Sequence, residues 1–196
     1  DFAFRNCSSL TSITIPDGVT SIGSFIFDYC SSLTRITIPD SVTSIGSSAF
    51  RACTSLTSIT IPDSVTSIGA GAFRTCTSLT SVTIGGSVAS IELVAFDGFT
   101  SLTNIIFLWA APATGESAFR NVQEGATAYV YEQFANSFGG FGSTWQGLLV
   151  EAVTRSTIET TITGSGTIEG AGSFAIGTTI TPVSYTHLRA HETSID

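Results

Sequence analysis

The stretch CTSLTSITIPDSVTSIG occupies residues 53–69, and CSSLTRITIPDSVTSIG stands one repeat earlier, at residues 30–46. Phenylalanines recur with the same spacing of 23 residues, at Phe4, Phe27, Phe50, Phe73, Phe96 and Phe119. Leucine and isoleucine positions follow the same period. A fixed period of this length is typical of repeat arrays, in which each unit stacks on the next.

Each repeat contains a short strand with one buried face. Residues 12–15, SITI, alternate polar and apolar side chains, which is the two-residue period of a β-strand. Pro16 ends the strand because proline has no N–H for a ladder, and the following aspartate suits a turn. We expect a second short extended piece near Ile22, and then a turn or 3₁₀ segment that is too short for a full helix.

A single 23-residue unit cannot bury its own apolar side, but stacked units can share one interior. Parallel strands in such a stack lie about 4.8 Å apart. The predicted fold class is therefore a β-rich solenoid of parallel strands with a 23-residue period, closed by a C-terminal cap and followed by a truncated small β module.

The pattern A-F-x-x-C-S/T-S-L-T-x-I-T-I-P-D-S-V-T-S-I-G resembles the BspA-like leucine-rich repeat family over residues 1–122. Residues 123–152 are similar to the cap of such arrays, in which Tyr129 and Val130 would form a capping strand and Trp145 would cover the end of the core. The resemblance implies a leucine-rich-repeat protein, bacterial in most cases, that is extracellular or at the cell surface. Its implied partners are surface or matrix proteins or glycans of a host or a neighbouring cell.

The composition changes after the cap. Residues 153–182 alternate β-branched residues with glycine-rich turns and resemble the truncated start of an internalin B-repeat-type module. Residues 183–196 resemble the translation of a sequencing adapter, and we interpret them as non-native. His187 and His191 have the spacing of a zinc pair, but they lie in this tail and we assign no metal site to them.

The bulk composition disfavours several classes of partner. Charged residues make up only 11% of the chain, lysine is absent, and the formal net charge is −8. A nucleic-acid partner requires a basic face that displaces phosphate counterions, and anionic lipid is disfavoured for the same reason. No apolar run reaches about 18 residues, so we expect no membrane span. The first residues, DFAFRNC, begin within a repeat, so we expect further native sequence upstream.

The four cysteines share one repeat position, at Cys7, Cys30, Cys53 and Cys76. Equivalent positions lie about 5 Å apart per coil, so the outer pair are separated by roughly 15 Å. Four thiolates in such a row cannot converge on one zinc ion, whose Zn–S bonds are about 2.3 Å long. We predict a ladder of buried thiols that fills the interior. Whether all four are free stays open, since disulfides between neighbouring coils are conceivable on Cα distance.

Two columns of charge run along the predicted array. Asp17, Asp40 and Asp63 follow the turn prolines, and they could bind Ca²⁺ or simply stabilise turns, which we favour. The second column consists of Arg5, Asp28, Arg51, Arg74, Asp97 and Arg120. Its arginines could donate to an acidic ligand, but we predict a solvated outer edge of mixed charge.

The outward strand positions form two nearly uncharged columns rich in hydroxyl groups. The candidate binding residues are Ser12, Thr14, Arg35, Thr37, Ser58, Thr60, Ser81, Thr83 and Asn104. Arg35 and Asn104 interrupt the serine and threonine pattern and are the candidate contact residues. The alternatives are an ice-binding surface, or an ordinary strand surface without a ligand, because threonine favours strands in any case.

No catalytic constellation is visible. The chain has no histidine before the tail, so Ser-His-Asp and Cys-His arrangements are not available, and no cofactor motif is present. We expect a non-enzymatic adhesion or protein-binding module that makes many weak contacts across the strand positions. The alternatives are a structural stalk or spacer that carries another domain, or an accessory module of a larger surface enzyme.

Overall fold

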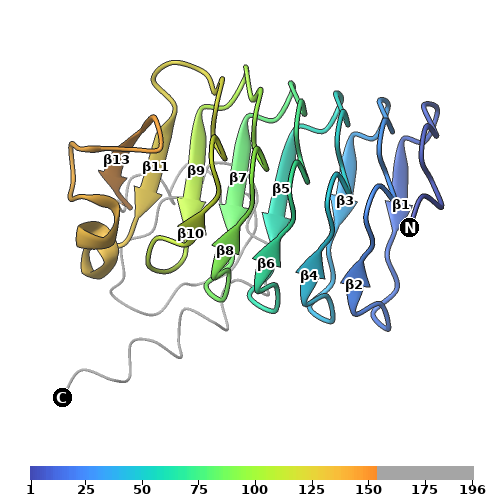
Figure 1. The fold of residues 1–196 in the computed structure, drawn as a ribbon, viewed down its shortest axis with the longest axis horizontal. Helices are drawn as coiled ribbons and strands as arrows, with labels where there is room; N and C mark the ends of the chain where they lie inside the picture. Colours follow the sequence, from blue (N-terminus) through green and yellow to red (C-terminus); the bar gives the residue numbers. More distant parts are fainter. Residues whose placement is uncertain (154–196) are drawn as a thin grey trace, which may run out of the picture. The chain divides into compact units, whose positions relative to one another are not determined.

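A computed structural model describes residues 1–153 of the chain, and Asp1–Ala152 form one compact unit. Figure 1 shows its coils stacked along one axis, from β1 near the N-terminus to β13 at the other end. Successive strands pair in parallel with an offset of one repeat, for example Ser58 with Ser81 and Ser81 with Asn104. The predicted parallel solenoid is confirmed. The proposed β module and the adapter-like tail lie outside the described residues, apart from Val153.

Two parallel sheets run along the solenoid. The first contains β1 (Ser12–Thr14), β3 (Arg35–Thr37), β5 (Ser58–Ile61), β7 (Ser81–Ile84), β9 (Asn104–Phe107) and β11 (Thr127–Val130). The second contains β2 (Ser21–Ile22), β4 (Ser44–Ile45), β6 (Ser67–Ile68), β8 (Ser90–Ile91) and β10 (Ala113–Thr114). The second sheet is continuous, whereas pairing in the first is interrupted between β3 and β5.

The turn between the two strands of a coil follows from the proline. The Val42 N–H donates to the Pro39 carbonyl at 3.0 Å, and the Val65 N–H donates to the Pro62 carbonyl at 3.1 Å. Proline favours such turns because its ring presets φ. In the fourth coil Gly85 replaces proline, and a Cβ atom there would lie only 2.5 Å from the Pro62 oxygen. Glycine thus allows a closer approach of the two coils at this turn.

The third side of each coil consists of turns, in agreement with the prediction of a segment too short for a helix. Non-glycine residues on this side have positive φ, for example Phe25 at 57° and Tyr29 at 60°. This conformation is unfavourable for residues with a Cβ, typically by about 1 kcal/mol or more. The positive φ directs backbone N–H groups toward the next coil. For example, the Tyr29 N–H donates to the carbonyl of Arg51, in the next coil, at 2.8 Å. These bonds between coils offset the local strain.

The interior is organised by a stack of phenylalanine rings. The ring centroids of Phe27, Phe50, Phe73 and Phe96 follow one another at 5.3, 5.1 and 5.4 Å, with interplanar angles of 16°, 8° and 2°. Each of these side chains is at most 3% exposed. The expected column of buried equivalent side chains is confirmed. Phe4, in the first coil, is 36% exposed because it has a ring neighbour on one side only.

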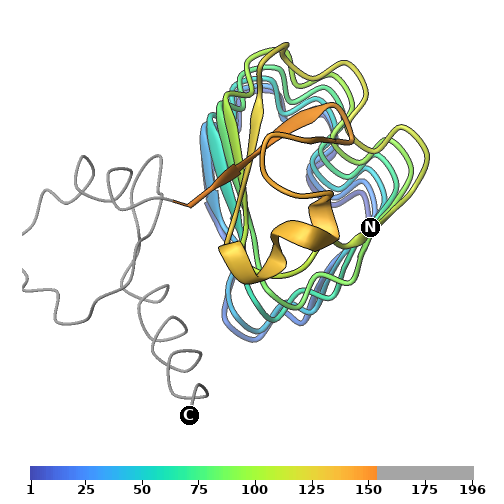
Figure 2. The ribbon, with the colours of Figure 1, turned by 90° about the vertical axis from the view of Figure 1, so that its left-hand side faces the viewer.

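The C-terminal end of the solenoid is covered by the segment after β11. It contains the 3₁₀ helix η1 (Glu132–Phe138), β12 (Thr144–Trp145) and β13 (Leu148–Ala152). β13 extends the first sheet in parallel, and β12 turns back antiparallel to it. The Trp145 ring lies 5.2 Å from Phe107, 5.5 Å from Phe119 and 5.0 Å from Phe138. Figure 2 shows these elements across the end of the coils. Through these ring contacts Trp145 covers the end of the core.

Candidate functional site

The outward side chains of the first sheet form a surface that we call the strand face. Pairing in register places Ser12 beside Arg35 and Thr14 beside Thr37, and it aligns the later coils in the same way. The exposed members are Ser12, Thr14, Arg35, Thr37, Ser58 and Thr60. Thr83 and Asn104 are half-buried, and Ser81 is buried. The structure therefore brings the candidate residues together in two columns that are most open over the first three coils.

Several threonines elsewhere on the solenoid use their hydroxyl groups to hold neighbouring coils. Bonds of 2.9–3.2 Å to the carbonyls of the preceding coil come from Thr34, Thr43, Thr66, Thr80 and Thr103. On the strand face, the hydroxyls of Thr14, Thr37 and Thr60 make no hydrogen bond to the described part of the chain. Sequence alone does not separate these two groups, because both are exposed threonines in the same repeat. The hydroxyls of Thr14, Thr37 and Thr60 are therefore exposed and unused within the described residues.

Arg35 is the only cation of the strand face between β1 and β11. The other four arginines in residues 1–153 each form an ion pair with an aspartate. Arg35 is exposed, and it has no ion pair or side-chain hydrogen bond within the described residues. It stands in β3, next to the interruption of the first sheet.

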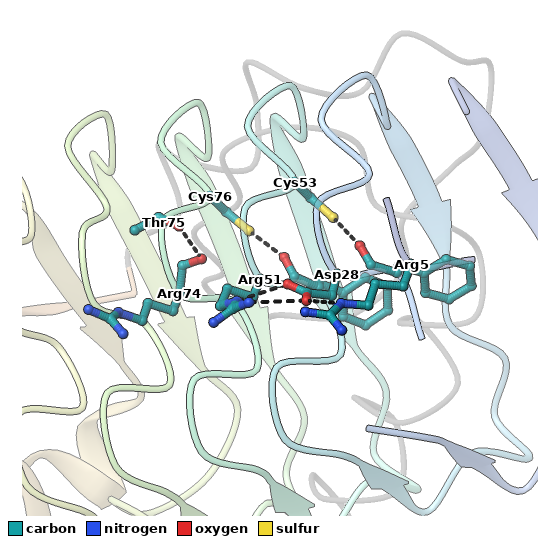
Figure 3. A network of polar contacts seen from close by, with 9 residues as sticks. Arg5, Asp28, Arg51, Cys53, Arg74, Thr75 and Cys76 are labelled. Atoms are coloured by element: carbon teal, nitrogen blue, oxygen red, sulfur yellow. Dashed lines mark hydrogen bonds and ion pairs between the residues drawn. The ribbon is translucent and has the colours of Figure 1, made fainter. Parts of the chain in front are cut away.

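The second column of charge, which we call the arginine edge, differs from the prediction of a solvated surface. Asp28 is fully buried, with 0% exposure. Arg5 Nε approaches its Oδ2 at 3.1 Å, and Arg51 donates through Nε at 2.8 Å and through Nη2 at 3.1 Å. Figure 3 shows Asp28 between these two arginines. The carboxylate is buried because side chains from the coils on both sides extend over it.

A second unit of the arginine edge repeats this arrangement around Asp97, which is 3% exposed. Arg74 Nε lies 3.2 Å from one carboxylate oxygen, Arg120 bonds both oxygens, and the Asn121 amide donates at 3.0 Å. The hydrogen bond from Arg120 is the main cause that lowers the pKa of Asp97, and Asn121 and Arg74 act in the same direction. The arginine edge is therefore a set of clamps between coils.

The Asp97→Asn variant is expected to be less stable than the parent protein by about 1–2 kcal/mol near neutral pH, because charge-assisted hydrogen bonds are lost. Since the pKa of Asp97 is lowered in the folded state, its contribution is fully present above the unfolded pKa of about 3.9 and is lost as pH falls through the folded value. Urea unfolding of both proteins at several pH values checks this. A stability difference that does not shrink in acid would contradict the assignment.

The cysteine prediction holds for three of the four thiols. All four are free, and Cys30, Cys53 and Cys76 are buried, whereas Cys7 is exposed in the described structure. The buried thiols donate to carbonyl oxygens, as Cys76 does to Phe50 at 3.1 Å. Burial raises the pKa of Cys30 to about 11, and the hydrogen bond with Cys76 together with burial raises that of Cys53. They fill the interior as small, inert side chains.

Cys7 is the one exposed thiol of the four. In the folded protein we therefore expect a disulfide reagent such as DTNB to modify Cys7 rapidly, because the reagent reacts with accessible thiols in their thiolate form. The other three of the four cysteines should react only after denaturation. Absorbance of the released thiolate gives the count, and a Cys7→Ser variant is the control. Fast reaction of that variant would contradict the buried ladder.

The aspartates after the turn prolines do not form a metal centre. No group of three or more histidine, cysteine, aspartate or glutamate side chains within the described residues could hold a metal ion. Asp63 Oδ1 instead accepts the Gly86 N–H of the next coil at 2.6 Å, so this carboxylate supports a turn. The calcium alternative is therefore not supported. Within residues 1–153, no helix has the length and hydropathy to span a membrane.

Comparison with known families identifies the repeat. The family described as "BspA type Leucine rich repeat region" matches residues 1–125, in six copies. A comparison with curated proteins found no match. The sequence pattern and the parallel coils thus agree with an independent family description.

Two solved structures share the architecture. The pneumococcal vaccine antigen PcpA is 24% identical with a TM-score of 0.61, and the match covers 76% of this chain and 38% of PcpA. A leucine-rich repeat protein from Eubacterium ventriosum is 31% identical with a TM-score of 0.53, over 61% of this chain and 32% of that protein. The match thus spans less than two-fifths of each of these two proteins.

Proposed function

Because the chain belongs to the BspA-type leucine-rich repeat family, we propose that it is a secreted or cell-surface module that binds partner proteins through its strand face. The pneumococcal structure with the same architecture is a vaccine antigen, which supports a surface location. The observation that carries the proposal is that the hydroxyls of Thr14, Thr37 and Thr60, which are exposed on the strand face, make no hydrogen bond to the described part of the chain. Several threonines of other columns, in contrast, donate their hydroxyl groups to the preceding coil.

The proposed mechanism is adhesion by many weak contacts. Serine and threonine are seldom energetic hot spots in interfaces, so each coil contributes little. Repetition along the solenoid lets these contacts act together on a partner that follows the face, which raises the overall affinity. The role is binding rather than catalysis, and the partners are surface or matrix proteins of a host or a neighbouring cell.

A pair of substitutions on adjacent coils tests the use of the strand face. Thr37→Glu combined with Thr60→Glu places two carboxylates on exposed positions of β3 and β5. We expect at least roughly a tenfold loss of affinity for any matrix protein that the unmodified chain binds, because polar groups of the partner would lose their contacts. Surface plasmon resonance on a panel of immobilised extracellular-matrix proteins provides the measurement.

The matched control is Thr43→Glu combined with Thr66→Glu. These threonines are also exposed and also lie on adjacent coils, but they border the second sheet. The control variant loses two hydroxyl bonds between coils, so circular dichroism and urea unfolding first establish that it is folded. The folded control variant should bind as the parent chain does. Equal losses in both variants would exclude the strand face as the binding surface. An absence of binding to every panel protein would favour the stalk or spacer role instead.

A further inference from the structure

The arginines of this chain fall into two different situations. Four of those described already hold an aspartate from a neighbouring coil, at distances of 2.8–3.2 Å. Each of these guanidinium groups therefore has a carboxylate in place. Arg35 alone among the described arginines has an exposed guanidinium group with no carboxylate against it.

The surroundings of Arg35 are neutral and polar. Ser12 is its register partner on β1, and Ser58 occupies the same repeat position on β5. Thr37 follows on the same face of β3. No aspartate or glutamate is present among the outward positions of the strand face from β1 to β11. The nearest acids along the sequence are Asp40, in the turn after Pro39, and Asp28, which is buried at the arginine edge.

We propose that Arg35 is the recognition residue of the strand face and that it binds one aspartate or glutamate side chain of the partner protein. This inference rests on the proposed function, whose ligand class it specifies. A guanidinium group presents paired N–H donors that match both oxygens of a carboxylate. The neighbouring hydroxyls of Ser12, Ser58 and Thr37 can donate to, or accept from, the polar groups beside that carboxylate.

The charge balance restricts the partner further. The chain has a formal net charge of −8, so its overall field repels a strongly anionic polymer. One isolated cation on a neutral surface suits one carboxylate within an otherwise uncharged segment. The expected partner surface is therefore a neutral, polar segment with a single acidic side chain.

A small probe tests the chemistry without a known partner. In the complete ¹⁵N-labelled chain, the Nε–H signal of Arg35 is followed by NMR during titration with N-acetyl-aspartate methylamide. It should shift and saturate, and the N-acetyl-asparagine compound should not produce this shift. The Nε–H signals of Arg51 and Arg120 are internal controls, because Asp28 and Asp97 already occupy those groups. An unmoved Arg35 signal, or equal movement of all three, would overturn the inference.

Substitution tests the same residue against any panel protein that binds. Arg35→Ser introduces the residue that other coils have at the same repeat position, as at Ser12 and Ser58, so the fold should be retained. We expect a loss of affinity of roughly 10- to 100-fold, as for removal of a charge-assisted hydrogen bond. Arg35→Ser combined with Ser87→Arg keeps the net charge but moves the cation to a turn, and it should not restore binding.

Chemical modification of the partner separates the two proposals. Conversion of the partner's carboxyl groups to amides should weaken its binding to the parent chain and leave its binding to the Arg35→Ser variant unchanged. Binding that survives amidation would overturn the role of Arg35 while the strand face stands. Loss after periodate oxidation of the partner's sugars, but not after amidation, would indicate a glycan ligand and also overturn it. A saturable Arg35 shift with no panel binding would preserve the carboxylate preference and reject the proposed function.

Discussion

Replacement of Phe73 by alanine is expected to lower the free energy of unfolding by about 3–5 kcal/mol, the usual range for a buried phenylalanine. Phe73 is 0% exposed and stacks on Phe50 at 5.1 Å and on Phe96 at 5.4 Å. The cavity would therefore remove contacts with the coils on both sides. Repeat arrays are stabilised by interactions between neighbouring coils. We therefore expect the coils before Phe73 and the coils after it to unfold less cooperatively with each other. Urea unfolding followed by circular dichroism measures the change.

Phe4→Ala is the matched control within the same column. Phe4 occupies the equivalent repeat position, but it is 36% exposed and stacks on Phe27 alone, at 5.4 Å. The expected loss is about 1–2 kcal/mol, since part of the ring is already in water. Equal losses for Phe4→Ala and Phe73→Ala would show that position in the stack does not determine the energy of the ring.

The second large effect is expected at the C-terminal end, where Trp145→Ala should reduce stability by about 2–4 kcal/mol. The indole contacts three rings, those of Phe107, Phe119 and Phe138, at centroid distances of 5.0–5.5 Å. Removal would expose the last coil of the core to water. We expect the last coils to unfold first, and hydrogen exchange of amides in β9 and β11 should report this opening.

Phe141→Ala provides the control for the cap. Phe141 lies in the same segment as Trp145 but is 44% exposed. Its replacement should change stability by about 0.5 kcal/mol or less, as for most surface substitutions. A large effect at Phe141, or a negligible one at Trp145, would contradict the assignment of Trp145 as the cover of the core.

These stability effects bear on binding because the same contacts set the spacing of the strand face. Each coil places its phenylalanine about 5 Å from the next one, and the outward hydroxyls of the coil follow at the same interval. A variant that opens the stack at Phe73 should therefore disturb the register of Thr60 and Thr83 as well. Binding and unfolding measurements on that variant should change together.

The repeat itself made most of the architecture predictable. The alternation in residues 12–15 and the proline that follows predict a strand and its end, and the structure contains β1 and its turn there. The 23-residue recurrence of phenylalanine predicts a shared interior, and the rings stack as expected. The positions of Arg35 and Thr37 on one outward face likewise follow from the two-residue period of a strand.

Other features depend on contacts between coils that no single repeat contains. Asp28 is an ordinary charged residue in the sequence, but Arg5 and Arg51, each 23 positions away, bury it. Cys7 and Cys30 share a repeat position, yet only Cys30 has a coil on both sides and is buried.

Local pattern thus determined the period, the strands and the direction of their side chains, because these depend on backbone geometry within one coil. The tertiary structure decided which charges are paired and which hydroxyls are used. It also placed Tyr29 in a left-handed conformation, at a φ of 60°. These outcomes are set by the energy of hydrogen bonds and ion pairs across the gap between coils.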